Sequence, residues 1–337
     1  MPEGDTTGAG AVDDLIQPFQ IESHSLRGRL VRLGPAIDAI LSAHDYPEPV
    51  ATLLGETVTL AALFADAMKF EGILTIQTKS DGPVNLLVAD VTSTGDIRGY
   101  AGYDADKLEA ALAGPVEAPV PMLLGSGFLA FTVDQGPRTE RYQGIVELTG
   151  ATLADCAHHY FRQSEQLDAA IQLAAGRVAD ANGGANGGAN GGANGEADAR
   201  AWRAGGLMLQ HLPPEGGKAE HNWDMDAQRD IDGWRETVVL MGTVKGDELL
   251  RPRLPPHDLL YRLFHEVGVR AFRTKALVHS CRCSREKVSN TLASLPRAEV
   301  EDCKEEGSDE VVVTCQFCNA CYRFDDEALA ALYEPEG

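Results

Sequence analysis

The sequence predicts an α+β fold with a mixed N-terminal core of antiparallel strands and packed helices, a partly helical linker region and a small cysteine-rich C-terminal domain. Three observations lead to this fold class. Apolar residues recur every three or four positions over 49–68, as in an amphipathic helix. Short apolar stretches separated by turn residues follow over 73–148, as in antiparallel hairpins. Six of the seven cysteines lie from Cys281 onward.

The N-terminal α/β core is expected over residues 15–177, after a disordered N-terminus at 1–14. The apolar spacing predicts its long helix at about 49–68. Thr152 is a suitable N-cap for a second helix, in which Cys156 is interpreted as a small packing residue. Alternating patterns bounded by turn residues predict five strands, at 73–79, 84–91, 97–103, 127–133 and 142–148.

A repeat rich in glycine and asparagine interrupts the chain after this core. Residues 181–195 read ANGGANGGANGGANG, which has no apolar face to bury, so we expect a disordered insertion over 178–200. The next stretch, 201–275, contains helix-like segments broken by glycines and by the prolines of RPRLPPH. Such short elements cannot cover their own apolar residues. We therefore expect a metastable linker region that docks on the core.

The C-terminal domain is expected over residues 276–337. Ser284 is a suitable N-cap for a helix whose Val288, Leu292 and Leu295 share one face. Strands at 311–314 and 322–324 flank a Cys-x-x-Cys turn, and a last helix begins near Asp325 with Leu329 and Leu332 facing inward. A segment of about 60 residues with so few apolar side chains cannot build an independent core. Something other than apolar burial must stabilise it.

Four cysteines in two pairs indicate a zinc site that stabilises this domain. Cys281-x-Cys283 and Cys315-x-x-Cys318 supply four thiolates, the set that tetrahedral Zn²⁺ accepts, so we expect one zinc ion per chain. Each pair is also close enough in sequence to form a disulfide, which would remove its thiolates from the metal. The spacing alone leaves open an inert structural site or a redox switch.

Two other cysteines lie near these pairs. Cys321 follows Cys318 by three positions and could compete as a ligand or exchange into a disulfide, and Cys303 lies between the two pairs. Because four paired cysteines already complete a tetrahedron, we interpret Cys303 and Cys321 as bystanders.

Composition and the absence of certain motifs disfavour several classes of function. A formal net charge of −22 disfavours nucleic acid as a partner. No apolar run approaches the roughly 18–20 residues that cross a bilayer, and the acidic N-terminus does not resemble a signal peptide, so we expect a cytoplasmic protein without membrane association. The chain has no phosphate-binding loop, and no histidine is placed to activate the serine of YFRQSEQ, so we do not expect an enzyme.

Two other function classes fit the cysteines less well. A zinc-ribbon regulator or nucleic-acid binder needs a basic face, but residues 276–337 carry 6 Lys and Arg against 13 Asp and Glu. A thiol–disulfide oxidoreductase would place its Cys-x-x-Cys at a helix N-terminus, whereas here the motif joins two predicted strands.

Several motifs resemble those of the heat shock protein 33 family of bacterial redox-regulated chaperones, also called 33 kDa chaperonins. They are CRCSREKV, CQFC with a following YRFD, YFRQSEQ, AGGLMLQHLP and LLYRLFHE, and the similarity extends from about residue 15 over almost the whole chain. The ANGG repeat, Cys303 and Cys321 depart from the family pattern.

The resemblance implies a cytosolic, ATP-independent holdase that is inactive while reduced and zinc-bound. It assigns Cys281, Cys283, Cys315 and Cys318 as the zinc ligands. It also implies that oxidative stress forms two disulfides, Cys281–Cys283 and Cys315–Cys318. Zinc would then be released, the switch domain and linker would unfold, and a surface for unfolding client proteins would be uncovered. The active form is expected to be a homodimer.

Overall fold

The structure, a computed structural model, describes residues 13–24, 26–68, 70–114, 118–136, 139, 141–165, 168–179, 200–211, 223–304 and 309–333. The chain divides into two compact units, Met1–His279 and Ser280–Gly337. Both combine helices with antiparallel strands, which confirms the α+β class. Most of the N-terminus and of the Gly/Asn-rich insertion, both predicted to be disordered, lies outside the described residues.

The first sheet of the larger unit has the strand order β10-β1-β2-β9-β8, and β11 also pairs with β1. All of these pairings are antiparallel. The strands are β1 (Leu15–Ile21), β2 (Leu26–Leu33), β8 (Ala169–Ala179), β9 (Arg200–His211), β10 (Val269–Ala271) and β11 (Lys275–Ala276).

The second sheet has the order β12-β5-β4-β3-β6-β7, in which only the short β12 is parallel to its neighbour. Its strands are β3 (Ile73–Ser80), β4 (Val84–Thr92), β5 (Asp96–Tyr103), β6 (Gly127–Asp134), β7 (Tyr142–Glu147) and β12 (Val278–His279). All five strands predicted between residues 73 and 148 are confirmed here, with ends that differ by one residue or none.

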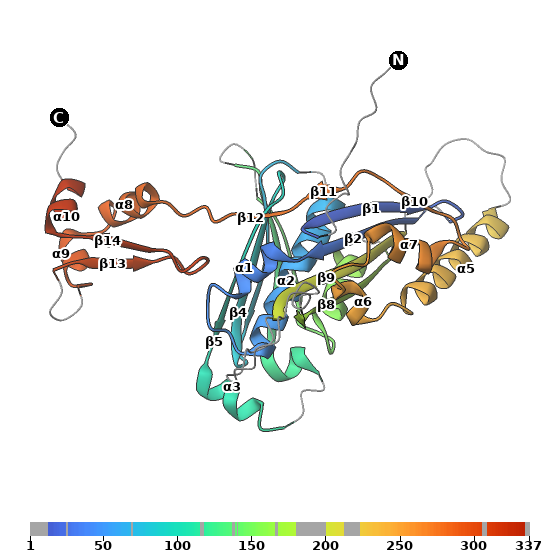
Figure 1. Cartoon of the computed structure of the whole chain (residues 1–337), viewed down its shortest axis with the longest axis horizontal. Helices are drawn as coiled ribbons and strands as arrows, with labels where there is room; N and C mark the ends of the chain where they lie inside the picture. The colour runs from blue at the N-terminus through green and yellow to red at the C-terminus, as the bar shows by residue number, and fades with distance from the viewer. Residues whose placement is uncertain are drawn as a thin grey trace, which may run out of the picture. The chain divides into compact units, whose positions relative to one another are not determined.

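Helix α2 (Glu48–Ala67) runs between the two sheets and packs on both (Figure 1). By length and composition it could cross a membrane, which our reading of the apolar runs did not recognise, but 72% of its most apolar window is buried inside the protein. Because both sheets cover it, most sides of the helix are apolar. Its composition is therefore that of a core helix.

Strand β9 corrects our assignment of residues 201–275 to one linker region. It lies between β2 and β8, and its residues from Arg203 to Leu209 are buried. A Cβ on Gly206 would lie 2.7 Å from Cγ2 of Thr59 on α2, and one on Gly205 would lie 2.8 Å from the carbonyl oxygen of Leu249. The two glycines therefore permit a close approach of the strand to α2 and to the backbone at Leu249.

Helices α5 (Trp223–Met241), α6 (Gly246–Leu250) and α7 (Pro256–Phe264) pack on the other face of the first sheet through a second apolar cluster. Buried Arg32 on β2 adds polar contacts: its guanidinium donates to the carbonyl oxygen of Leu254 at 2.6 Å and to that of Arg251. The described part of the predicted linker after β9 is thus docked on the core.

The remaining helical segments of this unit are α1 (Pro35–Leu41), α3 (Ala105–Ala111), α4 (Leu153–Tyr160) and two π-helical turns, Val120–Leu124 and Phe161–Glu165. Thr152 caps α4 as predicted, in a reciprocal capping box with Asp155. Cys156 on α4 is buried, and this burial raises the pKa of its thiol to about 11. The thiol is thus protonated at neutral pH, as a packing residue should be.

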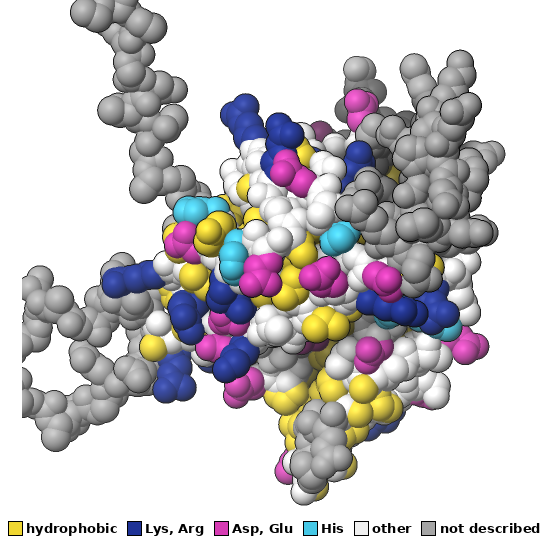
Figure 2. Space-filling view, turned by 90° about the vertical axis from the view of Figure 1, so that its right-hand side faces the viewer, with side chains coloured by type: hydrophobic (Ala, Val, Ile, Leu, Met, Phe, Trp, Pro, Cys, Tyr) yellow, Lys and Arg dark blue, Asp and Glu magenta, His cyan; other side chains and the backbone are white. Residues whose placement is uncertain are grey.

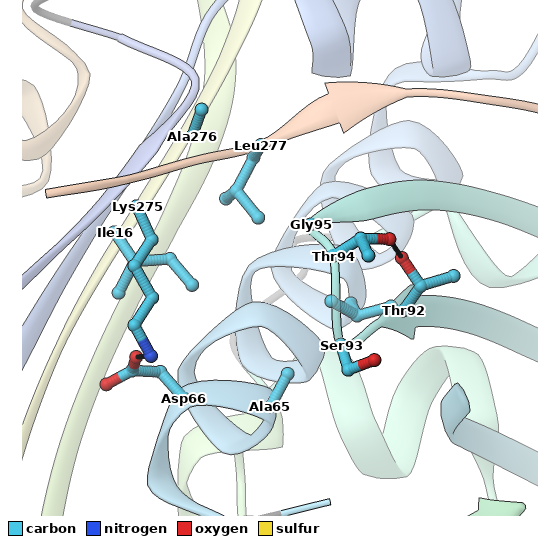
Figure 3. A pocket seen from close by; sticks show the side chains of 11 residues that line it. Ile16, Ala65, Asp66, Thr92, Ser93, Thr94, Gly95, Lys275, Ala276 and Leu277 are labelled. Carbon is cyan, nitrogen blue, oxygen red and sulfur yellow. Dashed lines mark hydrogen bonds and ion pairs between the residues drawn. The ribbon is translucent and has the colours of Figure 1, made fainter. Parts of the chain in front are cut away.

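A buried ion-pair cluster lies at the C-terminal end of α2. The Asp66 carboxylate is 2.8 Å from Nε of Arg29 and 2.5 Å from Nζ of Lys275, and only 5% of the Asp66 side chain is exposed. Asp66 and Lys275 line a pocket of about 270 Å³, together with Ser93 and Leu277 (Figure 3). Our sequence analysis did not identify this cluster.

Glu56 on α2 makes a pH-dependent contribution to stability. Burial raises its pKa from 4.5 to about 7, so the folded protein retains a proton that the unfolded chain releases. The free energy of unfolding should therefore fall as pH rises from 4.5 to about 7. In Glu56→Gln this loss should be absent, so the variant should gain about 3 kcal/mol relative to the parent between pH 4.5 and 8. Urea titrations followed by tryptophan fluorescence measure this difference. If the free energies of unfolding of the two proteins changed in parallel with pH, the prediction would be contradicted.

Candidate metal centre

The smaller unit has a minimal apolar core. It consists of α8 (Arg285–Ala293), α9 (Arg297–Glu301), β13 (Val311–Thr314), β14 (Cys321–Phe324) and α10 (Asp326–Leu332). As predicted, Ser284 caps α8 and Asp325 caps α10. The buried apolar residues of its core cluster are Leu292, Val300, Val311, Phe324 and Leu329.

Our prediction for Leu295 was wrong. Helix α8 ends at Ala293, so Leu295 leaves the helix face that it was predicted to share and is 42% exposed. Val300 on α9, a helix that we did not predict, is buried in the core cluster instead.

The β13–β14 hairpin places Cys315 and Cys318 in one turn. The amide of Cys315 donates to the carbonyl oxygen of Ala320 at 2.9 Å, and the amide of Asn319 donates to that of Cys315 at 2.8 Å. Asn319 has a φ of 58°, in the left-handed region that asparagine tolerates better than most residues. These contacts bend the chain so that both thiols face the same space.

Cys281 and Cys283 lie on the segment that leads from β12 into α8. Residues two apart in an extended segment point to the same side, which suits two ligands of one ion. The segment is fixed at its end by the Ser284 cap and by Lys287 of α8, whose Nζ donates to the carbonyl oxygen of Arg282 at 2.6 Å. Arg285 of α8 packs over the Phe324 ring at 4.3 Å, which joins this helix to the hairpin.

The structure brings the four predicted thiols together. Their sulfur atoms all lie within 4.8 Å of one another. The short contacts join the two segments: Cys281 Sγ is 3.7 Å from Cys315 Sγ, and Cys283 Sγ is 3.4 Å from Cys318 Sγ. Four sulfurs at ~2.3 Å from a tetrahedral zinc ion would be about 3.8 Å apart. The four thiols can therefore hold a metal ion with little rearrangement.

The electrostatics of the cluster favour a bound cation. Burial, together with contacts to the other three cysteine sulfurs, raises the pKa of the Cys318 thiol to about 12. Since a metal ligand must be a thiolate, four such groups can be deprotonated together only if a cation compensates their charge.

Tyr322 on β14 makes an outer contact to this site that sequence reasoning did not identify. Its hydroxyl donates a hydrogen bond to Sγ of Cys283 at 3.0 Å. This bond raises the pKa of Tyr322 to about 12, so the hydroxyl remains a donor at neutral pH. Donors around metal ligands orient and stabilise them.

We expect Tyr322→Phe to weaken metal binding about tenfold while the fold of the smaller unit is retained, because only the donor to Cys283 is lost. Competition with a chromophoric chelator measures the affinity. Tyr333→Phe is a matched control, since the Tyr333 hydroxyl donates to the carbonyl oxygens of Leu292 and Leu295 and to none of the cysteines. Equal affinities of the parent and Tyr322→Phe would refute the role assigned to this hydroxyl.

Cys303 and Cys321 lie outside the four-thiol cluster, and both are exposed. The Cys303 thiol donates to the carbonyl oxygen of Glu299 at 3.2 Å, and the Cys321 sulfur is 3.5 Å from Oγ1 of Thr314. Cys321 occupies the first position of β14, and its sulfur is also 3.7 Å from the carbonyl oxygen of Asn319.

Comparisons with known proteins identify the family of this chain. The family model described as Hsp33 protein matches residues 14–325. The chain belongs to the Hsp33 family. It is 40% identical to the 33 kDa chaperonin of Caulobacter vibrioides over 316 residues, which cover 94% of this chain and 96% of that protein. It is 36% identical to the 33 kDa chaperonin of Ectopseudomonas mendocina over 326 residues, 97% of each chain.

The fold agrees with that of a solved Hsp33 homologue. The crystal structure of the 33 kDa chaperonin of Thermotoga maritima matches with a TM-score of 0.71 at 23% identity, over 95% of this chain and 97% of that one. Membership of the Hsp33 family and the names of these relatives support a chaperone function.

Proposed function

We propose that this Hsp33-family protein is a redox-regulated, ATP-independent holdase of the cytoplasm, which binds unfolding client proteins under oxidative stress. One observation carries the proposal: the shortest sulfur contacts of the cluster link two chain segments whose shared apolar core has only five buried residues. The smaller unit therefore depends on those four thiols to remain folded.

In the reduced protein, Cys281, Cys283, Cys315 and Cys318 would hold one Zn²⁺ ion. When bound, the ion would cross-link the two segments and contribute on the order of 10 kcal/mol to their folding. The two segments supply two thiolates each, and Tyr322 supports Cys283 from outside the ligand set.

Oxidation would convert this cross-link into two local bonds. Each pair of thiolates, Cys281–Cys283 and Cys315–Cys318, would give two electrons to one peroxide molecule and form an S–S bond. The peroxide would take up two protons from solvent and be reduced to two molecules of water. Disulfides within the pairs leave no bond between the two segments. The small apolar core is then too weak to keep them together, and the unit should unfold.

Unfolding of the C-terminal unit can expose a client surface if α5–α7 also detach. These helices now cover the apolar face of the first sheet, where Phe19, Leu26, Leu30 and Leu207 are buried. On the face shown in Figure 2, charged side chains of both signs lie among apolar ones. Release of α5–α7 would add a continuous apolar surface, suited to unfolding clients and to pairing of two oxidised chains.

The other two function classes have less support. The Cys-x-x-Cys turn lies between β13 and β14 and not at a helix N-terminus, the position that lowers the thiol pKa in oxidoreductases. The acidic composition of the C-terminal segment disfavours a nucleic-acid interface.

The test compares the reduced and peroxide-treated protein in an aggregation assay with a thermally unfolded client and no nucleotide. We expect suppression of aggregation only after treatment, together with release of one equivalent of zinc. Thiol mapping should place the two disulfides within the pairs. Equal suppression by the reduced, zinc-loaded protein would refute the redox switch, and a metal-free reduced protein would refute the zinc site.

A further inference from the structure

An aromatic pocket beside strand β5 has no role in the proposed switch. His44, Asp45 and Tyr46, from the loop between α1 and α2, line it together with Tyr100 and Tyr103 of β5. Its volume is about 270 Å³, several times the ~30 Å³ that a water molecule occupies in the liquid. A small organic group can therefore enter.

The rings meet at steep angles instead of forming one stack. His44 lies 5.9 Å from Tyr100 at 70°, and Tyr46 lies 6.4 Å from Tyr103 at 62°, measured between ring centroids and planes. His44 and Tyr46 are 5.1 Å apart at 43°. Rings inclined in this way form walls around a space, and the face of each tyrosine ring carries negative potential.

The edge of β5 holds the pocket in place. Strand β12 pairs with β5 only at Asp96 and Ile97, so it does not cover the strand further along. There the amide of Ala101 donates to the Tyr46 hydroxyl at 3.1 Å. Because this bond ties the loop to the sheet, the walls are in place before any ligand binds, which lowers the entropy cost of binding.

The charges of the pocket favour a cation. Asp45 is the one charged side chain among the described residues that line it, and it is exposed. The whole chain carries a formal net charge of −22, which raises the local concentration of cations. Aromatic walls with an acidic group at the rim form the arrangement that recognises ammonium and guanidinium groups.

We propose that this pocket binds an organic cation, an alkylammonium or guanidinium group, presented by a Lys or Arg side chain of a bound polypeptide or by a free quaternary amine. The proposal is independent of the redox switch, since none of the pocket residues is a cysteine.

The test follows the Ala101 amide resonance of the reduced, full-length protein during titrations at constant ionic strength. The titrants are choline, its uncharged isostere neopentyl carbinol, N-acetylarginine methylamide and the corresponding citrulline derivative. We expect the cations to bind about tenfold more tightly than their neutral partners. Binding of the arginine derivative would identify a polypeptide side chain as the source, and binding of choline alone would identify a free quaternary amine.

Variants separate cation recognition from general apolar binding. Tyr100→Leu should weaken cation binding at least fivefold, and Asp45→Asn about twofold, whereas Tyr261→Leu, at a tyrosine that is 66% exposed on α7, should have no effect. Thermal midpoints establish that each variant is folded. Equal affinity for choline and neopentyl carbinol, unchanged affinity in a folded Tyr100→Leu, or no shift with any cation would overturn the proposal.

Discussion

Replacing Cys318 with serine should abolish stoichiometric zinc binding and unfold the C-terminal unit in the reduced protein. The Cys318 sulfur is 3.4 Å from that of Cys283, so the substitution removes one of the two close links between the segments. Metal binding of this kind contributes on the order of 10 kcal/mol to folding, far more than five buried apolar side chains can replace. Zinc quantitation and amide hydrogen exchange of residues 280–333 measure the two effects.

The matched control is the double variant Cys303→Ser and Cys321→Ser, at two exposed cysteines of the same unit. It should retain one zinc per chain and normal exchange protection. The two sheets and α2 of Cys318→Ser should also remain protected, because they share an apolar cluster of their own. A full zinc complement in Cys318→Ser, or a substoichiometric one in the double variant, would show that the ligands are assigned wrongly.

Replacing Asp66 with alanine should destabilise the larger unit by about 3–5 kcal/mol, because it leaves the buried Arg29 guanidinium without its carboxylate. The side chains of Asp66 and Arg29 are only 5% and 9% exposed. The remaining side-chain contact of Arg29, with Oε1 of Gln210 at 2.6 Å, is to a neutral group and cannot balance the charge. Urea denaturation followed by the fluorescence of buried Trp202 measures the loss.

Two further variants identify the cause. Lys275→Met removes the other partner of Asp66, but the Lys275 side chain is 63% exposed, so this change should cost no more than about 1 kcal/mol. The double variant Arg29→Met with Asp66→Leu replaces the ion pair with apolar groups and should recover most of the stability lost in Asp66→Ala. If the double variant were as unstable as Asp66→Ala, an unpaired buried charge could not be the reason.

Local patterns in the sequence were sufficient to predict many helices and strands of the fold. The strands over 73–148 alternate apolar and polar residues and are separated by turn residues, and Thr152, Ser284 and Asp325 are strong helix caps. These signals depend on a few neighbouring residues, so they can be read without knowledge of the rest of the chain. Strand β9 lacked such a signal. Both of its faces are covered, so it has no alternation of apolar and polar residues.

The contacts between distant segments could not be read from local patterns. Tyr322 and Cys283 are 39 positions apart, and Asp66 and Lys275 lie in the first and last thirds of the larger unit's sequence. The aromatic pocket likewise combines a loop near residue 45 with strand β5. Each of these sites depends on how sheets and helices pack, which involves the whole chain.

The sequence by itself determined the Hsp33 resemblance, the α+β class and the four cysteines that the structure brings within 4.8 Å. Ligand spacing is a local property, because two thiols separated by one or two residues reach one ion with little help from the fold. Only the tertiary structure decided that the short sulfur contacts join different segments, that β9 belongs to the core and that Arg29 and Asp66 are buried together. These features follow from packing between residues far apart in the sequence, where burial and distance have no local signature.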